Sequence, residues 1–111
     1  MANKYNLELF KLKAELCKTF ADPKRLMIIS ELRGGEKSVG SLVETLEIPQ
    51  AVVSRNLAIL RNHGIVMTRR EGANIYYSLS DEKIVLACDI VHEILQQQMI
   101  KNREIADKLI A

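Results

Sequence analysis

The stretch SVGSLVETLEIPQAVVSRNLAILRNHG, residues 38–64, decides the fold of this chain. Ser38 is suited to cap a short apolar helix, and the segment Glu47-Ile48-Pro49 ends that helix. A second helix follows from Ala51, and a glycine at position 64 closes it. Two short helices joined by a tight turn have the spacing of a helix-turn-helix.

The second of these helices carries two stripes of residues at helical spacing. One stripe is apolar and can anchor the helix: Val53, Leu57 and Leu60. The other is free to contact a partner: Ala51, Ser54, Arg55 and Ala58. With Gln50 in front, the free face combines small residues with Gln and Arg side chains that can read base edges in a DNA major groove. An ordinary amphipathic surface helix would have the same pattern, so the neighbouring segments must distinguish a DNA-binding helix from a surface helix.

The segment that follows predicts a β-hairpin with a positive charge. Residues 66–70 and 75–79 flank Glu71-Gly72-Ala73-Asn74, whose Gly and Asn are suited to positive φ at a hairpin tip. A hairpin directly after a helix-turn-helix is a wing. Four arginines and one acid lie between residues 48 and 78, which gives +3, whereas six acids and four bases from residue 81 onward give −2. The predicted DNA-facing segment is therefore the positive one.

At these residues the chain resembles the ArsR/SmtB family of bacterial and archaeal winged-helix repressors. The resemblance covers about residues 20–95 and rests on three stretches: FADPKRLMIISEL, GEKSVGSLVETLEIPQAVVSRNLAILRNHGIV and TRREGANIYYSLSD. Three positions depart from the family pattern. Pro49 stands where Ser is usual, Asn56 where His is usual, and Ala73 where Arg is frequent. These departures concern the base contacts and not the fold.

The pattern and the resemblance together predict a mainly α fold with a small β-hairpin wing, in the order α-α-α-α-β-β-α. We expect a single winged helix-turn-helix domain over residues 1–111, with DNA binding in 38–79 and dimerisation helices at 5–20 and 81–110. The predicted function is a transcriptional regulator, a repressor that binds a palindromic operator of double-stranded DNA as a homodimer. The predicted DNA contacts are Gln50, Ala51, Ser54, Arg55 and Asn56 of the helix and Arg69, Arg70 and Asn74 of the wing.

The flanking segments read as helices. Residues 5–20 carry a wide apolar face: Tyr5, Leu9, Leu12, Leu16 and Phe20. Asp22-Pro23 then starts a helix that Gly34-Gly35 ends, and its apolar run is expected to be core: Leu26, Met27, Ile28, Ile29 and Leu32.

The last helix is predicted to begin after a Ser80-Asp81 cap. Its seam repeats at four and three residues: Ile84, Cys88, Val91, Leu95, Gln98, Asn102, Ile105 and Leu109. A helix with such a repeat typically packs against another helix. In the family, the first and last helices pack together at a two-fold dimer interface. Because Gln98 and Asn102 are polar, the seam is expected to stop or bend near them.

Composition and motifs exclude several classes of function. The 111 residues are 48% hydrophobic and 27% charged, the balance of a globular domain. No apolar run reaches the length of a membrane span and no secretion signal is recognisable, so we expect a cytoplasmic protein without membrane partners. The chain has no glycine-rich phosphate loop, no HExxH and only two histidines, His63 and His92. We expect no enzyme and no cofactor.

Many relatives in the family are metal sensors, but this chain lacks their ligands. Where the thiolate site of those relatives reads ELCVCDL, residues 36–42 read EKSVGSL, with Ser38 and Gly40 in place of the two cysteines. The places of the family's zinc site on the last helix fall on Asp81, Lys83, Ile94 and Gln97. Only the aspartate is a ligand there, and we predict no metal site.

Cys17 and Cys88 are the remaining candidates for sensing. Two cysteines are too few for a disulfide framework. The family packs the first helix beside the last, so the resemblance allows a thiol pair that senses oxidants or sulfide-derived species. The alternative is that each is a small apolar residue in its stripe. The effector stays open, and a regulator without an effector is also possible.

A rival function from another class is a winged-helix module that binds a partner protein without specific DNA contact. Salt-dependent DNA affinity separates the two functions.

Overall fold

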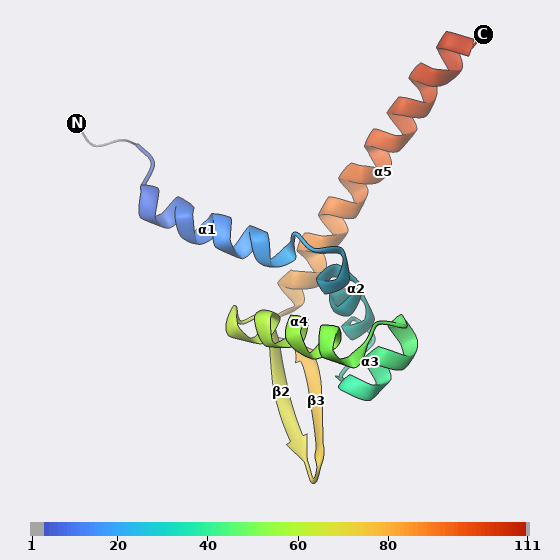
Figure 1. Ribbon diagram of the computed structural model, residues 1–111. Helices are drawn as coiled ribbons and strands as arrows, with labels where there is room; N and C mark the ends of the chain where they lie inside the picture. The colour runs from blue at the N-terminus through green and yellow to red at the C-terminus, as the bar shows by residue number, and fades with distance from the viewer. Residues whose placement is uncertain (1–3, 111) are drawn as a thin grey trace. The chain divides into compact units, whose positions relative to one another are not determined.

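The computed structural model describes residues 4–110, which form five helices and three strands in two compact units. The first unit ends at Ser80 and holds four helices and a small sheet, while the second, from Asp81, is one long helix (Figure 1). The predicted mainly α fold with a hairpin wing is confirmed. The order of elements differs from the prediction by one short strand, β1 (Lys37–Ser38).

The first two helices are α1 (Leu7–Phe20) and α2 (Pro23–Leu32). α1 starts two residues later than Tyr5, because the Asn6 side chain caps it by accepting a hydrogen bond from the Leu9 N–H at 3.3 Å. α2 begins as predicted, with Asp22 as its cap and Pro23 at its first position, where a missing N–H breaks no helical hydrogen bond.

The core prediction for α2 is correct for only part of its apolar run. Ile28, Ile29 and Leu32 are buried, whereas Leu26 and Met27 are 42% and 43% exposed. Within the first unit α2 contacts α3 and α4, and those neighbours cover one side of a helix that is apolar nearly all round. Leu26 and Met27 lie off that side and are surface residues of this chain.

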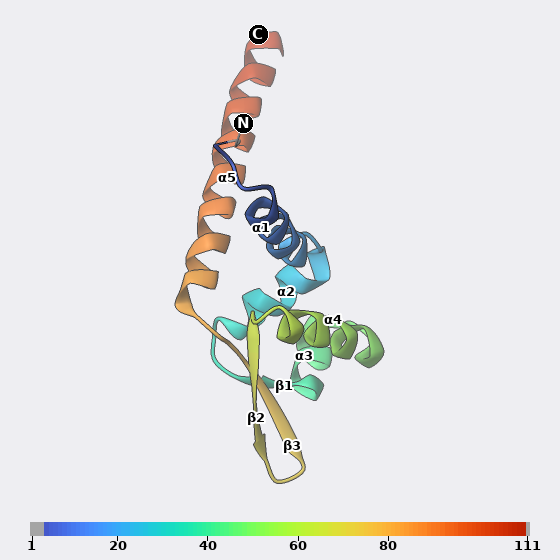
Figure 2. The ribbon, with the colours of Figure 1, turned by 90° about the vertical axis from the view of Figure 1, so that its left-hand side faces the viewer.

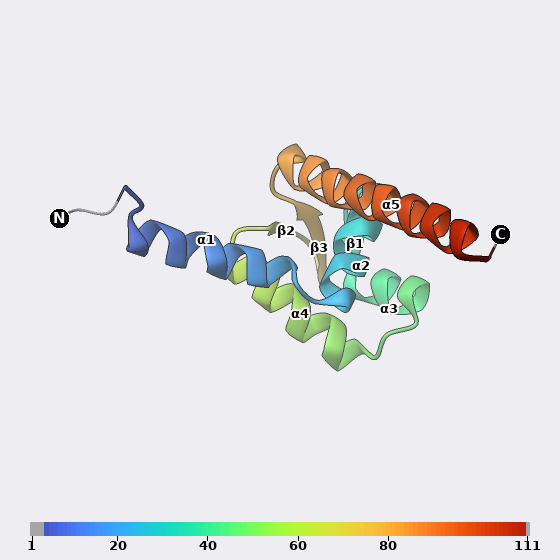
Figure 3. The same ribbon diagram turned by 90° about the horizontal axis from the view of Figure 1, so that it is seen from above.

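The helix-turn-helix consists of α3 (Val39–Leu46) and α4 (Gln50–Asn62). The Ser38 hydroxyl caps α3 by accepting from the Ser41 N–H at 3.2 Å. Figure 3 shows the turn that joins the two helices. Glu47, the residue that follows α3, has a left-handed φ of 54°. The predicted anchor stripe is confirmed, since Val53, Leu57 and Leu60 are fully buried.

The sheet has the strand order β1-β3-β2, and both of its pairs are antiparallel. β2 (Val66–Glu71) and β3 (Asn74–Leu79) form the wing, which Figure 2 shows projecting from the helices of its unit. Gly72 supplies the positive φ at the tip, 61°, whereas Asn74 already belongs to β3 and was wrongly predicted to share that role. At the base, Ser80 donates from its hydroxyl to the Gly64 carbonyl at 2.6 Å.

The second unit is α5 (Glu82–Ile110), a helix of 29 residues that the Asp81 side chain caps through the Lys83 N–H. The helix continues through Gln98 and Asn102, and the expectation that the apolar seam stops or bends near them stays a prediction. Both residue types tolerate a helix interior. Many of its apolar side chains are exposed, among them Leu86, Ile90, Val91, Ile94, Leu95, Met99, Ile100, Ile105 and Leu109. Between residues 4 and 110, no helix has both the length and the apolar content that crossing a bilayer requires.

Candidate nucleic-acid interface

The exposed face of α4 holds most of the predicted base-reading residues. Gln50, Ala51, Ser54 and Arg55 are all exposed, because the apolar stripe that anchors α4 lies on its other side. The sequence of α4 contains no acidic residue. The face therefore offers one cation, one amide and one hydroxyl, with an alanine that permits close approach to a groove.

Asn56 does not belong to this face, and its prediction as a DNA contact is wrong. The residue is 4% exposed. Its amide Nδ2 donates to the Val52 carbonyl at 2.9 Å, and its Oδ1 accepts from Arg25 Nη1 at 3.2 Å. Asn56 follows Arg55 by about 100° around the helix, which turns its side chain inward beside the anchor stripe. Sequence reasoning missed this because a polar residue next to an exposed arginine is typical of a solvent face.

The pleat of the wing separates the two adjacent arginines. The register pairs Arg69 with Tyr76, Arg70 with Ile75 and Glu71 with Asn74. Since successive residues of a strand point to opposite faces, Arg69, Glu71 and Asn74 share one face and Arg70 lies on the other. Arg70 is on the same side as Val66, which is buried in the unit's core. The wing therefore does not present all three predicted contacts together.

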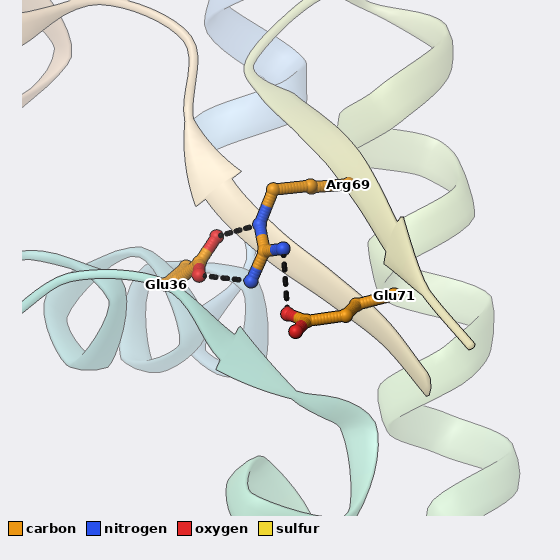
Figure 4. Close-up of polar contacts among 3 residues, drawn as sticks. All are labelled: Glu36, Arg69 and Glu71. Carbon is orange, nitrogen blue, oxygen red and sulfur yellow. Dashed lines mark hydrogen bonds and ion pairs between the residues drawn. The ribbon is translucent and has the colours of Figure 1, made fainter. Parts of the chain in front are cut away.

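Arg69 is held by two carboxylates (Figure 4). Its Nε and Nη2 donate to the two oxygens of Glu36 at 3.1 and 2.6 Å, and its Nη1 donates to Glu71 at 2.8 Å. The guanidinium also lies 4.9 Å from the centre of the Tyr76 ring. The hydrogen bond from Arg69 holds the pKa of Glu36 below its usual value, and both carboxylates raise the pKa of Arg69.

The DNA contact expected of Arg69 stays a prediction, and this cluster shows what the side chain binds in the free protein. Two carboxylates face its single charge, and three of its five N–H donors are used in these hydrogen bonds. Arg70 is exposed on the other face of the wing. Nothing in the sequence indicated the pairing, because Glu36 lies 33 residues before Arg69 and next to the short strand that the pattern did not predict.

The two cysteines lie in different units. Cys17 is exposed on α1, and Cys88 is half-buried on α5. Their role as a sensor stays a prediction. Of the places where the family has zinc ligands, Asp81 serves as the cap of α5. The described part of the chain contains no group of three His, Cys, Asp or Glu side chains arranged to hold a metal ion.

Comparison with known proteins gives a consistent result. Residues 22–68 match the model of the bacterial regulatory protein arsR family. The chain is 43% identical over 81 residues to a biofilm growth-associated repressor of Agrobacterium fabrum, a match that covers 73% of this chain and 69% of that protein. The chain belongs to the ArsR family.

Solved structures of similar proteins agree with this ArsR-family assignment. The crystal structure of Mycobacterium tuberculosis Rv0081 is 31% identical, with a TM-score of 0.81 over 87% of this chain and 98% of that one. The solution structure of a homodimeric winged helix-turn-helix DNA-binding domain of Mycobacterium bovis, Mb0332, is 27% identical, with a TM-score of 0.74 over 87% and 92%. As an ArsR-family protein, the chain is a transcriptional regulator with a winged helix-turn-helix DNA-binding domain.

Proposed function

We propose that this chain is a homodimeric repressor that binds a palindromic operator, with α4 in the major groove and the wing beside it. The observation that carries the proposal is the exposed face of α4, where Gln50, Ser54 and Arg55 stand out from a helix whose other side is fully buried. Rigid anchoring of the reading helix favours specific contacts, because base-edge hydrogen bonds need fixed donor positions. The relative from Agrobacterium fabrum is named a repressor, which supports the sign of the regulation.

A dimer is proposed from the apolar surfaces of the two units, each considered alone. α1 exposes Leu9, Phe10, Leu12 and Leu16, and α5 exposes apolar side chains over most of its length. The Mycobacterium bovis neighbour is homodimeric. A two-fold dimer would carry two copies of α4 to two half-sites about one helical turn of DNA apart, or a multiple of that distance. We propose that the protein acts in the cytoplasm, where its chromosomal target lies.

The test of the proposed function is binding of the whole protein to duplex DNA. Duplexes would be selected from a random library, and their affinity compared with that of a scrambled duplex by fluorescence anisotropy. We expect the selected sites to be inverted repeats. Replacing Arg55 by Ala should cost about 1–3 kcal/mol per half-site at its base position and lower the ratio of specific to non-specific affinity. Selection that enriches no sequence, with affinity insensitive to salt, would favour the protein-binding module instead.

The response to a signal is a separate proposal that rests on Cys17, the exposed thiol of α1, together with Cys88 of α5. We propose that oxidation or modification of these thiols releases the operator. The protein with both cysteines changed to Ser should bind the operator normally and no longer respond to oxidant or polysulfide. A variant that still releases the operator would show that both cysteines serve packing alone.

A further inference from the structure

A polar cluster lies on the buried side of α4, at the place where the end of α1 meets α2 and α4. Its centre is Arg25 of α2, which is half-buried. The guanidinium donates in three directions: Nε to the Thr19 carbonyl at 2.7 Å, Nη2 to the Lys18 carbonyl at 3.2 Å and Nη1 to Asn56 Oδ1 at 3.2 Å. One side chain thus joins the last turn of α1 to the middle of α4.

The two carbonyls that Arg25 binds lie in the last turn of α1, and that of Lys18 also accepts from the Ala21 N–H at 3.0 Å. The last carbonyls of a helix have no partner within the helix and carry the negative end of its dipole. An arginine there satisfies both the hydrogen bonds and the charge. Its planar fork fixes the direction of each donor, which a lysine ammonium on a flexible stem does not. The orientation of the Arg25 guanidinium therefore depends on the position of the end of α1.

Asn56 transmits that orientation to α4. Both of its polar atoms are used, because Nδ2 binds the preceding turn of its own helix while Oδ1 binds Arg25. The residue is 4% exposed, so a lost partner would leave a buried polar atom unsatisfied. Asn56 also directly follows Arg55, which points outward from the same turn. A change in the Arg25–Asn56 contact would rotate or tilt the face that carries Arg55.

We propose that Arg25 and Asn56 are positioning residues for DNA recognition: their contact couples the end of α1 to the orientation of α4 and so helps to set sequence specificity. Neither residue contacts DNA in this proposal. The inference rests on the proposed function, because it assumes that the exposed face of α4 reads the operator. It goes beyond that function by assigning specificity to two inward-facing side chains.

A pair of variants of nearly equal size tests the contact. Asn56→Asp keeps an acceptor for Arg25, whereas Asn56→Leu removes it. We measure the affinity of each full-length variant for the selected duplex and for a scrambled duplex, together with its melting temperature and mass in solution. We expect Asn56→Leu to lower the specific-to-scrambled ratio about tenfold, equivalent to about 1.4 kcal/mol, and Asn56→Asp to keep it within about twofold. Affinity for the scrambled duplex and its salt dependence should change little.

Arg25→Lys is the second variant and keeps the charge while losing the three-way fork. It should lower the ratio like Asn56→Leu, and the double variant should lose no more than either single one, because both break the same contact. Lys24→Gln is the matched control, since it removes a charge from an exposed neighbour on α2 and should leave the ratio unchanged.

The outcomes are separable. If the unaltered protein selects no sequence, the proposed function fails before any variant is made. If Asn56→Leu and Arg25→Lys proteins keep the ratio within twofold, the positioning role is wrong. Loss of the ratio in Asn56→Asp as well as in Asn56→Leu would place the effect in the bond to Val52 and also overturn the link to Arg25. If Asn56→Leu does not fold, Arg25→Lys alone decides.

Discussion

Adjacent residues of one strand have opposite surroundings in the wing. Arg69 is paired with Glu36 and Glu71, while Arg70 is exposed on the other face. An exposed ion pair contributes little to stability by itself. The cluster matters because it fixes the position of the Arg69 guanidinium and because it links β2 to the residue just before β1. The two arginines should therefore affect DNA binding in different ways.

The first prediction separates these arginines by salt dependence. We propose that Arg70 contacts a phosphate, so replacing it by Gln should lower affinity for every duplex and decrease the slope of log Kobs against log salt by about 0.9. Replacing Arg69 by Gln should decrease the slope by less, because its guanidinium is paired with Glu36 and Glu71 in the free protein. A titration of binding against salt measures both. Equal loss of slope in the two variants would contradict the assigned roles.

The second prediction concerns the behaviour of the same cluster at low pH. The hydrogen bond from Arg69 holds the pKa of Glu36 below its usual 4.5. A depressed carboxylate pKa stabilises the folded state above that usual value, and the stabilisation is lost as the pH falls through the folded-state pKa. We expect the Glu36 carboxyl to titrate below 4.5 by NMR and to return toward that value in the Arg69→Gln protein. An unshifted titration would mean that the pair is not formed in solution.

At the scale of elements, local chemistry made most of the fold predictable. Caps such as Ser38 and Asp22, the breaker Pro49 and the buried stripe of α4 each act within a few residues, and each was correctly located. The missed strand comes from an interaction across a long separation. β1 exists because Lys37 and Ser38 pair with Tyr77 and Tyr76 of β3, about forty residues later, and its two residues carry no strand pattern.

The candidate site follows the same division. The outward residues of α4 were predictable from helical spacing alone. The inward position of Asn56 follows from the same spacing, but its partner Arg25 and the partner of Arg69, Glu36, come from segments 31 and 33 residues away. Polar residues in contact at such distances leave no periodic signal in the sequence.

The third prediction tests the start of the helix-turn-helix. Replacing Ser38 by Ala removes the acceptor for the Ser41 N–H and should lower the free energy of unfolding by about 1 kcal/mol. Denaturant unfolding of the whole protein measures this. Ser41→Ala is a matched control, because it removes a hydroxyl from the same turn and keeps the capping bond to the Ser41 backbone. A Ser38 variant as stable as its control would show that the cap contributes nothing.

At the scale of the whole molecule, the fourth prediction is that the protein is a dimer in dilute solution. The apolar side chains that α1 and α5 expose in a single chain would be buried by association with a second copy. Because association stabilises the folded state, the melting temperature should rise with protein concentration. Light scattering should give twice the mass of one chain at micromolar concentration. Leu95→Glu, which places a charge in the α5 seam, should weaken the dimer, whereas the same change at the polar Gln96 should not. A monomer mass for the unaltered protein would contradict the two-half-site geometry.

The exposed seam of α5 also has a consequence for gene control. If only the paired form occupies the operator, occupancy at low abundance rises with the square of the number of chains in the cell rather than in proportion to it. Halving the gene dose would then lower operator occupancy about fourfold at the dilute limit, by mass action. The length of one helix would in this way sharpen the threshold at which the target genes switch off.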